Sequence, residues 1–164
     1  MILLESLETQ MNLTYHVPKT TVKCRAFLTS GQVNLTDGAW TKVLLNNESY
    51  DIGSNFDTAN SRFTAPVTGY YSISGTIHFT NVISDVTNWG FYNVGLYVNG
   101  ALYASAGDAV GVRGCAGTAT TLAPVTAGQY VELYAWVLYN AASHTVDVTG
   151  GSAYTALTVY LENV

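Results

Sequence analysis

Oxygen-bearing side chains are concentrated in the segment YDIGSNFDTANS, residues 50–61. Asp51, Asn55 and Asp57 supply carboxylate and amide oxygens, the hard ligands that Ca²⁺ prefers. Their spacing does not follow an EF-hand loop, and Asp and Asn also bond their own backbone in turns. The segment is therefore either a calcium site or a set of turn residues, and we expect no other cofactor.

The histidines and cysteines form no catalytic pattern. His16, His78 and His144 are isolated in the sequence, and no motif of a serine hydrolase, a zinc protease or a phosphate-binding loop occurs. Cys24 and Cys115 could form a disulfide or remain free thiols. We predict a non-enzymatic protein without catalytic residues, although carboxylates far apart in sequence can still converge in a fold.

A third group of residues that could bind a ligand is aromatic. The segment DVTNWGFYN, residues 85–93, places Trp89, Phe91 and Tyr92 among Asn and Thr. Such a mixture can stack on the face of a sugar ring and bond its hydroxyl groups. The segment is a candidate glycan-binding loop, and the alternative is that Trp89 only closes one end of a barrel.

Composition excludes several classes of partner. Only 10% of the 164 residues are charged, the formal net charge is -5, and the six Lys and Arg residues are scattered. A nucleic-acid footprint needs a basic stripe, so no nucleic-acid partner is expected. No run approaches the roughly 18 apolar residues that span a bilayer, and the N-terminus lacks the basic start of a signal peptide. We expect one domain and no membrane insertion.

The elements that must position these residues are predicted to be strands. From about residue 24 onward, β-branched and aromatic residues alternate with polar ones, between clusters of Gly, Asn, Asp and Ser. Asn99-Gly100 is the strongest hairpin signal, because a type I′ turn needs positive φ at both central residues. Ala127-Gly128 and Gly150-Gly151 mark two further turns. The pattern predicts an all-β sandwich of two sheets.

Residues 1–23 differ from the rest of the chain. Leu4, Leu7 and Met11 are spaced three and four residues apart and could form a short helical stripe before Pro18. The segment is too short to fold alone. We therefore predict an N-terminal anchoring or docking segment over residues 1–23 and a β domain over residues 24–164.

Strand parity separates the core from the opposite faces. The predicted core positions on three strands are Tyr71, Ile73, Ile77, Phe79, Val131, Leu133, Ala135, Val137, Leu157, Val159 and Leu161. The opposite faces carry large aromatic side chains that the core does not need, namely Tyr130, Tyr134, Trp136, Tyr154 and Tyr160. Tyr and Trp combine apolar area with a polar group, so such faces commonly meet another chain or a ligand. The alternative is that they face solvent singly.

One segment carries a family resemblance. RFTAPVTGYYSISG, at residues 62–75, follows a Tyr-Asp pair and precedes the late strand TAGQYVELYAWV. Over residues 24–164 this order resembles the complement component 1q globular domain, and the matching positions are Tyr50, Asp51, Phe63, Pro66, Gly69, Tyr70, Tyr71, Val131 and Leu133. The departures are Gln129 for Asp, Ser72 for an aromatic residue, and Ala156 and Leu157 for the terminal Gly and Phe. Collagen repeats are absent.

The resemblance implies a ten-stranded jelly roll of the tumour necrosis factor type, a compact homotrimer, and recognition rather than catalysis. Some members of that family bind calcium. In such a trimer, the aromatic residues Tyr130, Tyr134, Trp136, Tyr154 and Tyr160 are expected at the threefold interface.

Two functions are compatible with this resemblance. The low charge and the composition favour a phage or virus structural protein, a fibre tip or a capsid decoration protein, in the virion. Residues 1–23 would anchor it to another particle component, and its loops would bind a host surface glycan or protein. The alternative is a secreted, extracellular, complement-like protein that binds glycans or proteins.

Overall fold

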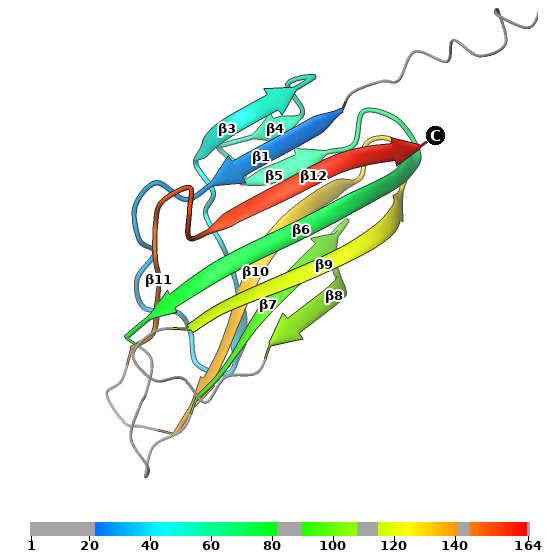
Figure 1. The fold of residues 1–164 in the computed structure, drawn as a ribbon. Helices are drawn as coiled ribbons and strands as arrows, with labels where there is room; N and C mark the ends of the chain where they lie inside the picture. The colour runs from blue at the N-terminus through cyan, green and yellow to red at the C-terminus, as the bar shows by residue number, and fades with distance from the viewer. Residues whose placement is uncertain (1–21, 82–89, 108–114, 141–144, 164) are drawn as a thin grey trace, which may run out of the picture.

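The computed structural model describes residues 22–81, 90–107, 115–140 and 145–163 (Figure 1). These residues form β-strands and connecting turns, with no helix among them. The strands are β1 (Lys23–Phe27), β2 (Ala39–Lys42), β3 (Asn47–Ile52), β4 (Phe56–Asp57), β5 (Arg62–Thr64), β6 (Gly69–Thr80), β7 (Gly90–Val98), β8 (Ala101–Gly107), β9 (Cys115–Val125), β10 (Tyr130–Tyr139), β11 (Asp147–Val148) and β12 (Ala156–Asn163). The all-β class predicted from the sequence is confirmed.

The strands form two antiparallel sheets that pack face to face (Figure 1). In the first sheet the order is β11-β6-β12-β1-β3, and β9 pairs with β6 on its other side. In the second sheet the order is β4-β5-β10-β7-β8. Neighbours in space are therefore often distant in the chain, as a jelly-roll sandwich requires.

Strand β2 lies along the edge of β10 that β5 leaves open. The N–H of Val43 donates to the carbonyl of Leu133 at 2.9 Å, and the N–H of Gly38 donates to that of Val137 at 2.8 Å. These bonds place the side chains of β2 beside the outward side chains of β10.

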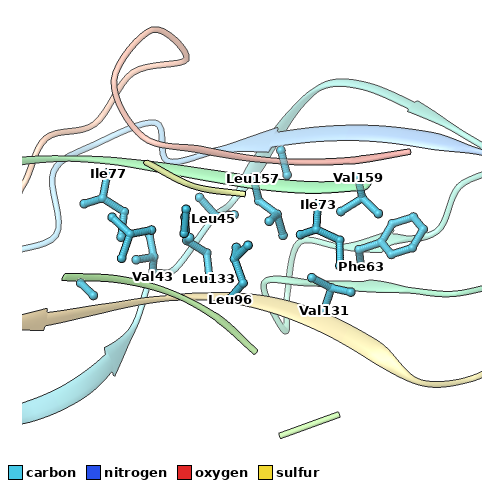
Figure 2. Packing of buried hydrophobic residues seen from close by; sticks show 14 of the residues in the cluster. Val43, Leu45, Phe63, Ile73, Ile77, Leu96, Val131, Leu133, Leu157 and Val159 are labelled. Carbon is cyan, nitrogen blue, oxygen red and sulfur yellow. The ribbon is translucent and has the colours of Figure 1, made fainter. Parts of the chain in front are cut away.

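The core lies between the sheets, where the predicted parity holds. Tyr71, Ile73, Ile77 and Phe79 of β6 are fully buried, as are the inward residues of β10, Val131, Leu133, Ala135 and Val137. Figure 2 shows Ile73, Leu157 and Val159 packing toward Leu96, Val131 and Leu133. Burial of this apolar area is the main force that holds the sheets together.

The predicted hairpin between β7 and β8 is present. Asn99 and Gly100 have φ angles of 49° and 80°, the positive values that a two-residue type I′ turn needs. Gly128 and Gly151 also have positive φ, at 85° and 115°, in the turns that precede β10 and β12.

The first described residue already belongs to the sandwich. Val22 is buried in the core, and its carbonyl accepts the N–H of Leu161 at 3.0 Å. The predicted helical stripe and His16 lie outside the described residues. Across the parts of the chain that the structure describes, no helix has the length and apolar character to cross a membrane.

Candidate functional site

The predicted calcium ligands lie where two short strands meet. Asp51 is in β3, Asp57 is in β4, and Asn55 lies in the turn between them. The Oδ2 atom of Asp51 accepts the backbone N–H of Phe56 at 2.8 Å, which fastens this turn. The Oδ1 atom of Asp51 and the Nδ2 atom of Asn55 are buried without a hydrogen-bond partner.

Asp57 organises the turn that follows β4. It accepts backbone N–H groups from Ala59 and Asn60, each at 3.0 Å, and the side-chain amide of Asn60 at 2.6 Å. These hydrogen bonds from Asn60 hold the pKa of Asp57 below its usual value. Among the described residues, no cluster of three or more His, Cys, Asp or Glu could hold a metal ion. Calcium binding by the three named residues stays a prediction.

His78 and the two cysteines have structural surroundings. The Nδ1 atom of His78 shares a hydrogen bond of 2.9 Å with the hydroxyl of Thr149, and its ring lies 5.4 Å from that of Tyr154. Cys24 and Cys115 are both free thiols. Burial raises the pKa of Cys24, with Asp51 adding to the effect, and burial raises that of Cys115 to about 11. A thiol with a raised pKa is a poor nucleophile near neutral pH.

The candidate glycan loop is only partly described. Trp89 lies outside the described residues, as does His144. Phe91 begins the exposed side of β7, whereas Tyr92 is buried in the core, with its ring 5.6 Å from that of Phe79. Phe91 and Tyr92 therefore point to opposite sides of β7, and a role of either in ligand binding stays a prediction.

The five aromatic residues predicted at a trimer interface do not share a surface. Tyr130, Tyr134 and Trp136 lie on the outward side of β10, in the second sheet. Tyr160 lies on the outward side of β12 in the first sheet, and Tyr154 lies just before that strand. The sandwich separates the two groups, so at most one of them can lie at a single flat interface.

The outward side of the first sheet is a surface of hydroxyl groups, which we call the hydroxyl face. It is formed by Ser72, Ser74, Thr76 and His78 of β6, Thr118, Thr120, Leu122 and Pro124 of β9, and Thr158 and Tyr160 of β12. Strand register places Thr158, Ser74 and Thr120 in one row across the three strands. Charged residues also occur on this sheet: Glu162 of β12 is exposed, and Lys23 and Arg25 of β1 lie in register with Tyr160 and Thr158.

One end of the hydroxyl face is apolar. Leu122 is 57% exposed and lies in register with Ser72, which in turn pairs with Tyr160. The phenol groups of Tyr160 and Tyr50 share a short hydrogen bond. Burial and this bond to Tyr160 raise the pKa of Tyr50 to about 12. Tyr70, beside this end, is 50% exposed.

The outward side of the second sheet carries four packed rings, which we call the aromatic stripe: Trp40, Tyr97, Tyr134 and Trp136. The ring centres of Tyr97 and Tyr134 are 4.0 Å apart. Trp40 meets Tyr97 edge-on at 5.9 Å and Trp136 at 6.4 Å. Each such pair contributes about 0.5–1.5 kcal/mol beyond its area burial. All four side chains are partly exposed.

An ion pair lies within the aromatic stripe. Lys42 Nζ contacts Glu132 Oε1 at 2.5 Å and also donates to the carbonyl of Asn60. The hydroxyl of Tyr134 donates to Glu132 Oε2 at 3.3 Å. Burial, and next the charge of Glu132, raise the pKa of Tyr134 to about 12. Glu132 is only 6% exposed, so its charge depends on these two donors.

On the same side of the second sheet, Arg62 of β5 contacts Tyr130 of β10. Its guanidinium carbon lies 5.1 Å from the centre of the Tyr130 ring, a cation–π distance. Asp57 is paired with Arg62 in the register of β4 and β5, and the charge of Arg62 helps to lower the pKa of Asp57.

Sequence reasoning missed Trp40, Lys42 and Tyr97 as members of this surface. The available signal was Gly95, an isolated glycine inside a strand pattern, which indicates a close approach. A Cβ atom at Gly95 would lie 2.5 Å from the Trp40 ring, so the indole occupies the space that this glycine leaves. Nothing in the local sequence connects Trp40 to β7.

Sequence comparison finds a phage-like element protein among the relatives of this chain. No family model matches it. The phage-like element PBSX protein XkdV of Bacillus subtilis (strain 168) is 27% identical over 137 residues, which cover 77% of this chain. The uncharacterized protein YqcC of the same strain is 31% identical over 108 residues, or 60% of this chain. The chain spans only 19% of the length of the first relative and 28% of the second.

Solved structures show the same fold. The globular domain of zebrafish complement 1qA protein matches 86% of this chain and 97% of its own, with a TM-score of 0.54 and 12% identity. The Eiger TNF from S. frugiperda matches 87% of this chain and 92% of its own, with a TM-score of 0.60 and 10% identity. Identities this low are informative about architecture alone, and the described chain has the C1q and TNF-like β-sandwich fold.

Proposed function

We propose that this chain is a non-enzymatic structural module of a phage particle that assembles as a homotrimer. The observation that carries the proposal is the similarity to the phage-like element protein over 77% of this chain, together with a sandwich fold. Because the relative is much longer, the chain corresponds to one part of such a protein. Fold alone would not identify a function.

The hydroxyl face is the surface that we assign to trimer contacts. On β6 and β9 it carries no Asp, Glu, Lys or Arg, and its Ser and Thr side chains are short, while Glu162 of β12 and Arg25 of β1 border it. Interface cores are depleted of charge, which β6 and β9 satisfy. The exposed Leu122, Tyr70 and Tyr160 supply apolar area at one end. Of the five predicted interface residues, this assignment keeps Tyr154 and Tyr160.

The aromatic stripe suits a trimer interface less well. Its rings already pack against one another, and a charged pair lies among them. Another subunit over this surface would also remove the partly exposed ammonium of Lys42 from water, a cost that its attraction to Glu132 does not reliably offset. We therefore place Tyr130, Tyr134 and Trp136 on the exterior of the trimer.

The module serves as a fibre tip that attaches the particle to a surface, or as a decoration that braces its shell. Residues 1–23 are proposed to join it to another particle component. A trimer would also resist unfolding, because association stabilises the folded subunits by mass action.

Sedimentation equilibrium tests the assembly. We expect a mass of about three times the 17.6 kDa of the chain. The measurement is repeated without residues 1–21, which lie outside the described sandwich. A trimer that survives this truncation supports an anchoring role for the segment, and a monomer from both samples contradicts the trimer.

A second experiment tests the location. Antibodies against residues 22–163 are used for gold labelling of purified particles of the phage or prophage that encodes the chain. Labelling at one substructure distinguishes a fibre tip from a shell decoration. Particles without label contradict the proposed function.

A further inference from the structure

The aromatic stripe has the chemistry of a sugar-binding platform. Partly exposed Tyr and Trp rings offer apolar faces on which the C–H faces of sugar rings can stack. The four rings hold each other in place at centre distances of 4.0–6.4 Å. A surface that is already ordered loses little side-chain entropy when a ligand binds.

Fixed polar groups lie among the rings. The carboxylate of Glu132 is held by Lys42 and by the hydroxyl of Tyr134. Strand register places Asn93 opposite Trp136, and Ser105 in the row of Gly95 and Tyr134. A few placed donors and acceptors beside an apolar surface are the usual composition of a small-molecule site.

The electrostatics of this surface favour a neutral ligand. The charge of Lys42 is opposed by Glu132 at 2.5 Å, and Arg62 lies in register with Asp57. The exposed residues of the adjacent strand β8 are uncharged, since its sequence is ALYASAG. No excess charge remains on this part of the second sheet to attract a polyanion or a polycation.

The shape of the stripe favours an extended chain. It follows β10 from the row of Glu132 and Tyr97 to Trp136, which spans about 14 Å at the usual rise of a strand. Phe91 pairs with Leu138 and is exposed at this end, so the apolar surface continues beyond Trp136. A surface of this length accommodates several sugar rings in a row.

A protein partner fits this surface less well. Anchor residues of protein interfaces project into pockets of the partner, and the centres of such interfaces are depleted of charge. Here the rings pack against each other edge-on or tilted, the Trp40 ring fills the gap above Gly95, and the Lys42–Glu132 ion pair lies beside them.

We propose that the aromatic stripe binds a neutral polysaccharide, with Trp136, Trp40 and Tyr97 as stacking residues and Asn93 and Ser105 as hydrogen-bonding residues. The proposal rests on the proposed function, because that function leaves the aromatic stripe on the exposed exterior of the trimer. It moves sugar recognition away from the candidate loop around Trp89.

The test uses the whole chain on an array of neutral, anionic and cationic oligosaccharides. We expect binding to neutral oligosaccharides, and about tenfold or greater weakening in Trp136→Ala, since one stacked ring is lost. Trp89→Ala is the matched control and should bind as the wild type does. Loss of binding in Trp89→Ala with retention in Trp136→Ala would overturn the proposal in favour of the loop.

Ser105→Arg gives a test that does not depend on removing a packed ring. Ser105 is exposed on the edge strand β8, so a long side chain there covers the stripe without disturbing the core. We expect binding of the same oligosaccharides to fall, with an unchanged melting temperature. Unchanged binding in this variant, or a wild-type protein that binds no neutral oligosaccharide, overturns the proposal.

These outcomes are separate from those that test the proposed function. A particle-associated trimer that binds no sugar contradicts only the sugar site. A monomer that is absent from particles and still binds neutral oligosaccharides contradicts only the trimeric particle module.

Discussion

The two outward faces of the sandwich are built from different side chains on similar backbones. On the hydroxyl face, Ser74 lies in a row with Thr120 and Thr158, so three neighbouring strands contribute hydroxyl groups there. On the opposite side, the row of Tyr134 and Gly95 is covered by an indole. Both faces lie over the same apolar core (Figure 2).

The comparison shows that polar side chains have different roles on the two sheets of one domain. Short hydroxyl side chains on β6 and β9 leave an uncharged surface whose apolar end, at Leu122, is exposed. In the aromatic stripe, by contrast, the rings pack against one another, and the buried carboxylate of Glu132 is paired with Lys42. The first arrangement suits contact with another subunit, and the second suits a ligand that needs a rigid platform.

Placing a charge on each face should separate these roles most strongly. In Ser74→Arg, association at a threefold contact brings three new positive charges together, and like charges at an interface cost several kcal/mol. We expect roughly 100-fold or greater weakening of trimer association, measured by sedimentation. Ser105→Arg on the second sheet is the matched control and should remain trimeric. Dissociation of the control alone would reverse the assignment of the faces.

Removing the cation beneath the aromatic stripe should affect stability next. In Lys42→Ala, Glu132 stays buried without its ammonium partner, and we expect a loss of about 2–3 kcal/mol in the free energy of unfolding by urea. The partial exposure of Lys42 keeps this value below that of a fully buried pair. Lys23→Ala in β1 is the control and should change stability by less than about 0.5 kcal/mol. Equal effects of the two variants would show that the pair is not structural.

Adding a single methyl group next to the Trp40 ring should have the next largest effect on stability. In Gly95→Ala the new Cβ would lie 2.5 Å from the Trp40 ring, so the indole must move. We expect a loss of about 1–3 kcal/mol, as for other overpacked sites, together with a change in tryptophan fluorescence. Ser74→Ala adds no atom to the hydroxyl face and should stay within about 0.5 kcal/mol. An unshifted emission spectrum in Gly95→Ala would contradict the packing of Trp40.

The smallest expected effect is on the pH dependence of stability. Burial and Glu132 raise the pKa of Tyr134 to about 12, above the value near 10 in an unfolded chain. Its stabilising contribution is complete below pH 10 and is lost as the pH rises through 12. The stability of Tyr134→Phe should therefore fall less steeply than that of the wild type between pH 10 and 12, in urea titrations. Equal slopes would show that this phenol ionises normally.

The sequence predicted the parts of the fold that depend on local periodicity. Tyr71 and Ile73 alternate with Tyr70 and Ser72 in a period of two, and the structure buries the first pair and leaves the second outward. The Asn99-Gly100 hairpin was equally readable, because few residue pairs accept two positive φ angles.

Other assignments depended on packing that the sequence does not display. The sequence matches the family pattern at Gly69 without showing why glycine is needed there: Gly69 begins β6, and a Cβ there would lie 2.4 Å from the carbonyl oxygen of Asn163. Tyr92 was placed in a ligand loop, and the inward side of β7 buries it. In both cases the deciding neighbour is distant in the chain.

The sequence by itself determined the all-β class, the core parity and the turns, because backbone propensity and alternation act between residues that are close in the chain. Only the tertiary structure decided which outward residues meet. It placed Tyr154 and Tyr160 on one side of the sandwich and Tyr134 and Trp136 on the other, since the connections pass between the sheets. It also brought Trp40 over Gly95 and Lys42 to Glu132, contacts that depend on β2 lying along β10.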